Sequence, residues 1–166
     1  MRRCGSQIDS TSAQKADYRV IVIGAGFSGI NAGIRLKQAG ITDFVILERA
    51  DDVGGTWRDN TYPGCACDVP SVVYSYSFEQ QPDWSRSFAG NHEIHQYIHH
   101  CVEKYDLMPW LRFGANVQQA VFDARAGLWR LTLKGGSQLT ARAVVSVVGG
   151  LLNPAYPTIP GLETFK

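Results

Sequence analysis

The sequence has 166 residues, and 16 Lys and Arg against 15 Asp and Glu leave a formal net charge of +1. This near neutrality gives no electrostatic reason to expect a nucleic acid or an anionic membrane as a partner. Hydrophobic residues make up 45% of the chain and charged residues 19%, which is typical of a globular protein. The length is enough for one domain core, but not for two nucleotide-binding domains and a catalytic lid.

Residues 1–17 are polar, with Arg2, Arg3 and Lys15 but no apolar segment. They predict a disordered N-terminal tail, with no secretory signal and no membrane-spanning helix. The cysteines follow no spacing typical of a disulfide framework or a zinc site. We therefore expect a cytoplasmic protein without a bound metal, whose cysteines are all reduced thiols: Cys4, Cys65, Cys67 and Cys101.

The first ordered segments predict a βαβ unit. A β-branched run indicates a buried strand over Tyr18–Ile23, and a helical apolar pattern follows over Ser28–Ala39. Gly40 stands where a glycine commonly ends a helix, and a second buried strand is expected over Phe44–Glu48. The two strands should be parallel and joined by a right-handed crossover.

The segment Asp51–Pro70 lacks periodicity and predicts a long loop, which is often a sign of function. An apolar stripe then predicts a helix over Asn91–Tyr105, with Asn91 as its N-cap. Alternating segments separated by glycine turns predict a three-stranded antiparallel meander, followed by one more buried strand. We expect these four strands over residues 117–122, 128–133, 138–142 and 143–148. Residues 18–166 thus predict an α/β domain, in which a Rossmann-like parallel sheet is combined with the meander.

A complete G-x-G-x-x-G motif, Gly24 to Gly29, lies between the first strand and the first helix. In this context Gly24 permits the tight turn and Gly26 lets the backbone approach a pyrophosphate. Gly29 allows the helix to pack closely on the strand, and the helix N-terminus faces the anion. The alternative is a glycine-rich turn that binds nothing.

Glu48 ends the second strand, about 20 residues after the last glycine, where a carboxylate accepts hydrogen bonds from an adenosine ribose. A negative charge at this position opposes a 2′-phosphate. The motif therefore predicts binding of FAD or NAD(H) and not of NADP(H).

The loop from Gly54 to Asp68 carries the most specific pattern in the chain. It reads Gly-Gly-Thr-Trp-Arg-Asp-Asn-Thr-Tyr-Pro-Gly-Cys-Ala-Cys-Asp and matches every fixed position of [AG]-G-x-W-x(4)-[FY]-P-[GM]-x(3)-D. This loop resembles that of the Baeyer–Villiger flavin monooxygenases of the cyclohexanone and phenylacetone type, and more broadly that of the flavin-containing monooxygenases. The resemblance extends from Tyr18 to the last residue.

The resemblance implies an enzyme that uses FAD, NADPH and O2 to convert a small ketone into an ester or lactone through a C4a-peroxyflavin. It also implies roles for individual residues. The pyrophosphate would be held by Gly24, Gly26, Phe27, Ser28 and Gly29, and the ribose by Glu48. The inner half of the flavin would lie along Gly55, Thr56 and Trp57.

Three further roles follow from the resemblance. Asp68 corresponds to a carboxylate near the flavin that positions a catalytic arginine from a later part of the chain. Tyr74 corresponds to a flavin-contacting tyrosine, and Val117 would offer its backbone to the adenine. Ordinary packing by Trp57 and Tyr62, and a loop cap by Asp68, are the structural alternatives.

The sequence departs from the family in two places. Val147-Val148-Gly149 replaces an Ala-Thr-Gly or Ala-Ser-Gly, which removes a hydroxyl. The family's longer fingerprint should begin at Phe165, and its histidine, a second G-x-G-x-x-G and the catalytic arginine do not follow. We therefore expect an N-terminal fragment that binds FAD weakly at best and does not oxidise NADPH alone.

Two other functions stay open: an N- or S-oxidising flavin monooxygenase, and a non-catalytic remnant that binds FAD, another adenine nucleotide or a partner chain. The histidines of the 91–105 helix are expected on its solvent side. His95 and His99 are four residues apart, but no glutamate follows His95 as in a zinc-protease motif, so we expect no metal there. The full set is His92, His95, His99 and His100.

Overall fold

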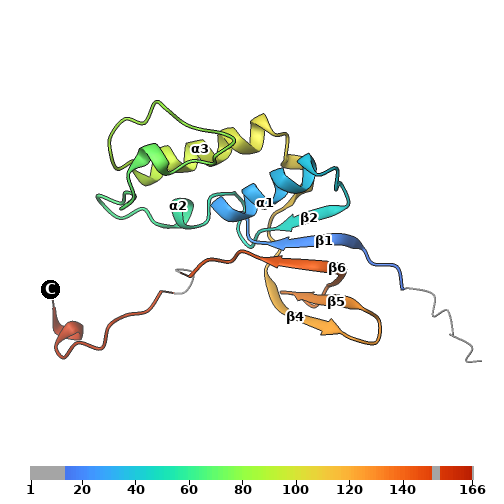
Figure 1. Cartoon of the computed structure of the whole chain (residues 1–166). Helices are drawn as coiled ribbons and strands as arrows, with labels where there is room; N and C mark the ends of the chain where they lie inside the picture. Colours follow the sequence, from blue (N-terminus) through green and yellow to red (C-terminus); the bar gives the residue numbers. More distant parts are fainter. Residues whose placement is uncertain (1–13, 151–153, 166) are drawn as a thin grey trace, which may run out of the picture.

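A computed structural model describes residues 14–150 and 154–165 (Figure 1). Its strands form one six-stranded sheet in the order β3-β2-β1-β6-β5-β4. The strands are β1 (Tyr18–Ile23), β2 (Phe44–Leu47), β3 (Leu111–Arg112), β4 (Val117–Asp123), β5 (Leu128–Leu133) and β6 (Gln138–Ser146). The helices are α1 (Phe27–Gln38), α2 (Thr56–Asp59) and α3 (Asn91–Lys104), with 3-10 turns η1 (Ser71–Val73), η2 (Met108–Trp110) and η3 (Leu162–Thr164).

The central strand β1 confirms the predicted βαβ unit. It pairs in parallel with β2 on one side and with β6 on the other, and β2 pairs in parallel with β3. Successive side chains of a strand point to opposite faces. Val20 and Val22 therefore pack in the cluster beneath the helices, whereas Ile21 packs in a second cluster on the other face with Leu131 of β5. Both faces of β1 are covered, as expected for a buried parallel strand.

The antiparallel meander is confirmed, but its last strand differs from the expectation. The segments 138–142 and 143–148 form the single strand β6, because no turn residue interrupts the chain between Arg142 and Ala143. The first part of β6 pairs with β5, and most of its parallel register with β1 lies in the second part. The meander therefore continues the parallel sheet.

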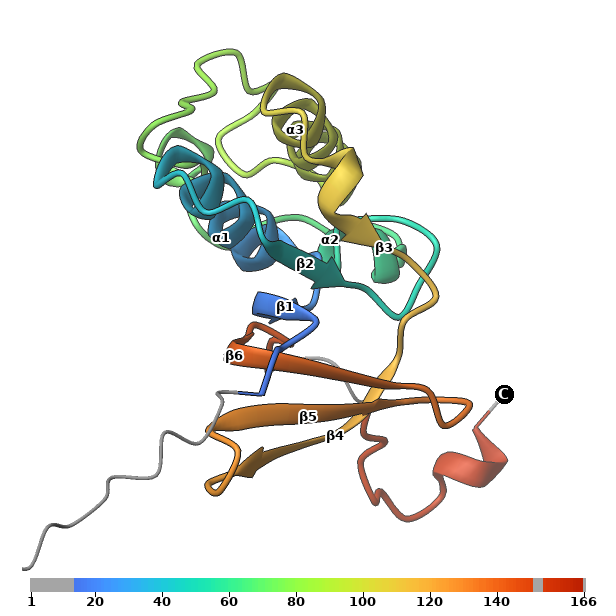
Figure 2. The same ribbon diagram turned by 90° about the vertical axis from the view of Figure 1, so that its right-hand side faces the viewer.

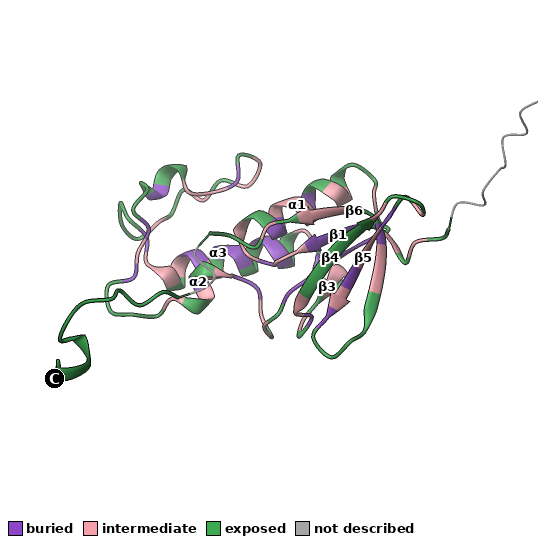
Figure 3. Cartoon of the chain, turned by 90° about the horizontal axis from the view of Figure 1, so that it is seen from below, coloured by how far each residue is buried: buried purple, intermediate pink, exposed green. Residues whose placement is uncertain are grey.

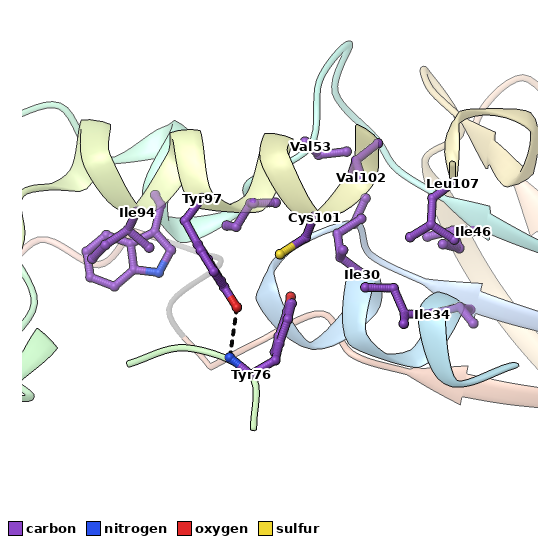
Figure 4. Packing of buried hydrophobic residues seen from close by; sticks show 14 of the residues in the cluster. Ile30, Ile34, Ile46, Val53, Tyr76, Ile94, Tyr97, Cys101, Val102 and Leu107 are labelled. Atoms are coloured by element: carbon purple, nitrogen blue, oxygen red, sulfur yellow. Dashed lines mark hydrogen bonds between the residues drawn. The ribbon is translucent and has the colours of Figure 1, made fainter. Parts of the chain in front are cut away.

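Helices α1 and α3 lie side by side, next to the β2 end of the sheet (Figure 2). Figure 4 shows Ile94, Tyr97 and Cys101 of α3 directed toward Ile30 of α1 and toward Tyr76. The hydroxyl of Tyr97 accepts a hydrogen bond from the backbone N–H of Tyr76 at 2.8 Å. The predicted apolar stripe of α3 is thus the core contact.

Two local expectations are corrected. The N-cap of α3 is Gly90 and not Asn91, because the extended backbone of Gly90 places its carbonyl to accept the N–H of Ile94. The side chain of Asn91 instead donates to the carbonyl of Asn60. The long loop after β2 is not wholly irregular, since it contains α2.

The edges and ends of the described chain are more exposed than its centre. Figure 3 shows β4 largely exposed, in contrast to the buried middle of β1. Of the expected tail, residues 14–17 are described, and the carboxylate of Asp17 accepts hydrogen bonds from Thr140 that lower its pKa.

No helix in the described ranges is long and apolar enough to cross a membrane. The free and buried cysteines are Cys65, Cys67 and Cys101, and the expectation for Cys4 lies outside the described residues.

Candidate dinucleotide-binding site

The first glycine turn connects β1 to α1 and is shaped by the absence of side chains. Gly24 has φ = +106°, and a Cβ there would lie 3.0 Å from the carbonyl oxygen of Val147. Gly26 is the N-cap of α1. A Cβ on Gly29 would lie 1.9 Å from the carbonyl oxygen of Gly24, a distance that no side chain tolerates. The three glycines thus allow the helix to start directly against the strand.

A second glycine turn, Gly54-Gly55, lies against the first. The backbone N–H of Gly54 donates a 3.0 Å hydrogen bond to the carbonyl of Ala25. Gly55 has φ = +53°, and a Cβ there would lie 3.2 Å from the Cα of Gly26. The two turns are far apart in the sequence but form one glycine-lined surface at the N-terminus of α1.

Glu48 connects this surface to the end of β2. Its side chain is buried, and its Oε2 accepts the N–H of Ala25 at 2.8 Å. Its Oε1 accepts the N–H of Ala50 at 3.0 Å and lies 3.4 Å from Nη1 of Arg58. Sequence reasoning did not find Arg58, because it occupies a variable position of the 54–68 pattern and carries no signal of its own.

Aromatic side chains pack behind the two turns. The indole N–H of Trp57 donates to the hydroxyl of Tyr74 at 3.1 Å, and the two rings meet edge to face. Phe27 contacts Tyr74 with ring centroids 5.1 Å apart. Burial raises the pKa of Tyr74. The structure therefore brings together three predicted site residues from different parts of the chain.

Three other predicted site residues, Ser28, Thr56 and Asp68, are exposed. Val117 begins β4, two residues after Ala115, whose N–H donates to the main-chain carbonyl of Glu48 at 2.8 Å. The start of β4 thus lies near the end of β2, although contact of Val117 with an adenine stays a prediction.

The expectation that His95 faces solvent is wrong. A Cβ on Gly54 would lie 2.5 Å from Cδ2 of His95, so the imidazole packs directly on the second glycine turn. Nε2 of His95 lies 2.9 Å from the carbonyl oxygen of Val53. The helical pattern did not reveal this contact, because the loop that covers His95 has no periodicity.

Comparisons with known proteins agree with this geometry. Residues 22–90 match a family model described as an NAD(P)-binding Rossmann-like domain. A Baeyer-Villiger monooxygenase of Streptomyces coelicolor is 52% identical over 147 residues, which are 89% of this chain and 28% of that protein. One of Pseudomonas aeruginosa is 49% identical over 94% of this chain and 30% of its own length.

Solved structures of monooxygenases are also similar to this chain. The crystal structure of cyclohexanone monooxygenase from Rhodococcus sp. Phi1 bound to NADP+ has a TM-score of 0.81 and 34% identity, over 92% of this chain and 30% of that one. A complex of OTEMO with FAD and NADP has a TM-score of 0.82 and 32% identity, over the same shares of the two chains. The chain spans about 30% of the length of these relatives. Over that stretch, it is similar in sequence to proteins named Baeyer-Villiger monooxygenase and in fold to cyclohexanone monooxygenase.

Proposed function

We propose that this chain forms the FAD-binding part of a Baeyer–Villiger monooxygenase, which uses NADPH and O2 to convert a ketone into an ester or lactone. One observation carries the proposal. The Gly24–Gly29 turn and the Gly54-Gly55 turn pack back to back at the start of α1, with the buried Glu48 bonded to the first. This pair of turns leads directly into the loop whose pattern resembles the family.

The N-terminus of α1 fits a pyrophosphate. Its N-cap is Gly26, and the first turn of the helix contains no acidic residue, so a dianion meets no like charge from that turn. The unpaired N–H groups at a helix start are ready donors for phosphate oxygens. The residues proposed to hold the pyrophosphate are Gly24, Gly26, Phe27, Ser28 and Gly29.

Glu48 fits the ribose of an adenine nucleotide. Each carboxylate oxygen accepts one backbone N–H, and Oε2, which is not the oxygen paired with Arg58, has a further lone pair for a ribose hydroxyl. A 2′-phosphate would bring negative charge to a buried carboxylate, which is unfavourable. This supports FAD at the site, and leaves NADPH as a co-substrate that binds elsewhere in the whole protein.

The remaining proposed contacts lie toward the flavin. Gly55, Thr56 and Trp57 would follow its inner half, and Tyr74 is held in place by Trp57. We propose that Val117 contacts the adenine and that Asp68, which is exposed on its loop, orients an arginine from another part of the whole protein. When bound, FAD supplies the redox chemistry, and these residues bind and orient it.

The first test is an equilibrium titration of FAD with the purified chain, followed by the visible absorbance and the fluorescence quenching of the flavin. We expect saturable, weak binding of FAD, and weaker binding of NADH in the same titration. No change in the flavin spectrum at any protein concentration would contradict the proposed site, and tighter binding of NADH would favour a simple NAD-binding module.

The second test addresses the reaction. Residues 18–166 would replace the matching segment of the Streptomyces coelicolor relative, with which this chain shares 52% identity. We expect the chimera to oxidise NADPH in the presence of cyclic ketones, and a chimera with Gly29→Ala to lose that activity. Turnover of amines or sulfides without ketones would instead support an N- or S-oxidising monooxygenase.

A further inference from the structure

A cluster of metal-ligating groups lies on the outer side of the second glycine turn. His95 and His99 stand one helical turn apart on α3, and Asp52 faces them from the loop after β2. Oδ2 of Asp52 lies 3.3 Å from Nε2 of His95 and 3.0 Å from Nε2 of His99. One ligand atom from each residue falls within a common range of 4.8 Å.

We propose that Asp52, His95 and His99 form a binding site for a divalent transition-metal ion, with Zn²⁺ as the best match. The site is separate from the proposed function and does not depend on FAD binding. Sequence reasoning set the two histidines aside because they lacked an adjacent glutamate. The structure supplies the third ligand from a different element.

The spacing suits tetrahedral coordination. Zinc bonds to imidazole nitrogen and carboxylate oxygen are about 2.0–2.2 Å, so two ligand atoms on one ion lie roughly 3.3 Å apart. The two Asp52–histidine distances lie close to this value. Two imidazoles and one carboxylate also form a donor set that favours zinc. Magnesium and calcium instead favour oxygen ligands alone.

The surroundings allow an ion to enter and hold the ligands in place. The side chain of His99 is 48% exposed and that of Asp52 is 38% exposed, which leaves room for a water as fourth ligand. Oδ1 of Asp52 accepts the N–H of Val53 at 2.8 Å, so Oδ2 stays directed at the histidines. A neighbouring cation, Arg58, is paired with Asp59 at 2.8 Å.

In the absence of an ion, the same distances fit hydrogen bonds between the carboxylate and the two imidazoles. Nε2 of His95 also approaches the carbonyl of Val53 and would give up that contact on ligation. The ion would then join α3 to the loop that precedes Gly54. Since it binds the folded arrangement of all three ligands, it should raise thermal stability.

The test is titration of the tag-free chain with Zn²⁺ by isothermal calorimetry and thermal unfolding. We expect one equivalent to bind and to raise Tm. Binding should weaken at least about tenfold in His99→Gln and in Asp52→Asn, as expected for loss of a metal ligand or its support. His92→Gln is the matched control, since His92 is exposed on the same helix and should leave binding unchanged.

Two measurements on the unchanged chain keep the proposal testable if a variant fails to fold. Side-chain NMR signals of His95 and His99 should shift with Zn²⁺ while that of His92 stays. Bound Co²⁺ should show d–d absorption without a thiolate charge-transfer band. The proposal is overturned by absence of binding, by equal binding in His99→Gln, or by a thiolate band that shows the ion at the cysteines.

Discussion

The backbone N–H of Ala25, in the middle of the first glycine turn, donates a 2.8 Å hydrogen bond to Oε2 of Glu48. The carboxylate therefore has a structural role in addition to its proposed role as a ribose acceptor. It fixes the turn from the end of the neighbouring strand, and its other oxygen fixes the N–H of Ala50. The shape of the first glycine turn and the position of the proposed ribose acceptor are thus set by one buried side chain.

Glu48→Gln should lower both stability and FAD affinity. The amide keeps the shape but has only one acceptor oxygen, so one of the two backbone N–H groups would face an NH2 group. An unsatisfied buried donor costs about 1–3 kcal/mol, and we expect a loss of that size in the free energy of unfolding. Urea unfolding and quenching of flavin fluorescence measure the two effects.

Glu103→Gln is the matched control, because Glu103 is exposed on α3 and its replacement should change neither quantity. If Glu48→Gln unfolds at the same urea concentration as the unchanged chain and binds FAD equally well, Glu48 has neither role.

Arg58 should be energetically coupled to Glu48. Its guanidinium lies 3.4 Å from Oε1 of Glu48, and its side chain is only 14% exposed. Side chains joined by a largely buried ion pair show coupling of roughly 0.5–3 kcal/mol in double-mutant cycles. We expect a value in this range for Arg58→Met combined with Glu48→Gln, measured by urea unfolding.

The comparison cycle pairs Arg49→Met with Glu48→Gln. Arg49 is paired with Asp59 and is 42% exposed, so its coupling to Glu48 should be close to zero. Equal coupling in the two cycles would show that Arg58 acts through general charge and not through its contact.

Gly29→Ala should disrupt the first turn. The added Cβ would lie 1.9 Å from the carbonyl oxygen of Gly24, and the backbone must move to relieve this clash. Overpacking of this kind costs about 1–3 kcal/mol, and the shifted helix start should also lose FAD. Thermal unfolding and quenching of flavin fluorescence check the result. Gly150→Ala is the control, because a Cβ added there would meet no atom of the described residues within 4 Å and the change should be neutral.

The parts of the fold that the sequence predicted well are those with a strong local signal. The β-branched run of β1 gave its observed bounds, and the apolar stripe of α3 placed Ile94, Tyr97 and Cys101 in the core. The α3 pattern arises because one face of the helix is buried, and the β1 pattern because both faces of the strand are buried. The spacing of apolar residues along the chain reports such burial directly. The prediction of two strands in place of β6 was wrong, because the sequence does not show which neighbouring strand each half of β6 pairs with.

The backbone geometry of the candidate site was predictable where glycine spacing determines it, as at Gly24 to Gly29. It was not predictable where a contact depends on how an irregular loop folds back. His95 against Gly54 and Arg58 against Glu48 are contacts of this kind. Each joins a residue to a partner whose position is set by tertiary packing, and neither has a periodic signal in the chain.

Above pH 9 the free energy of unfolding should fall because of Cys101. Burial raises the pKa of this thiol from 9.0 to about 11. The thiol therefore ionises in the unfolded chain near pH 9 but stays protonated in the folded chain until about pH 11. Stability is lost as pH rises through this interval, because deprotonation favours the unfolded state.

Urea unfolding of the unchanged chain and of Cys101→Ala, measured at about pH 8 and about pH 10.5, tests this. Cys101→Ala should be less stable at both pH values, because it leaves a small cavity beside Tyr97 and Ile30, but it should lose less stability between them. Burial also raises the pKa of Tyr97, and Cys101 raises it further, so the comparison reports the thiol together with its effect on Tyr97. Equal pH dependence in the two proteins would mean that the buried thiol makes no contribution to it.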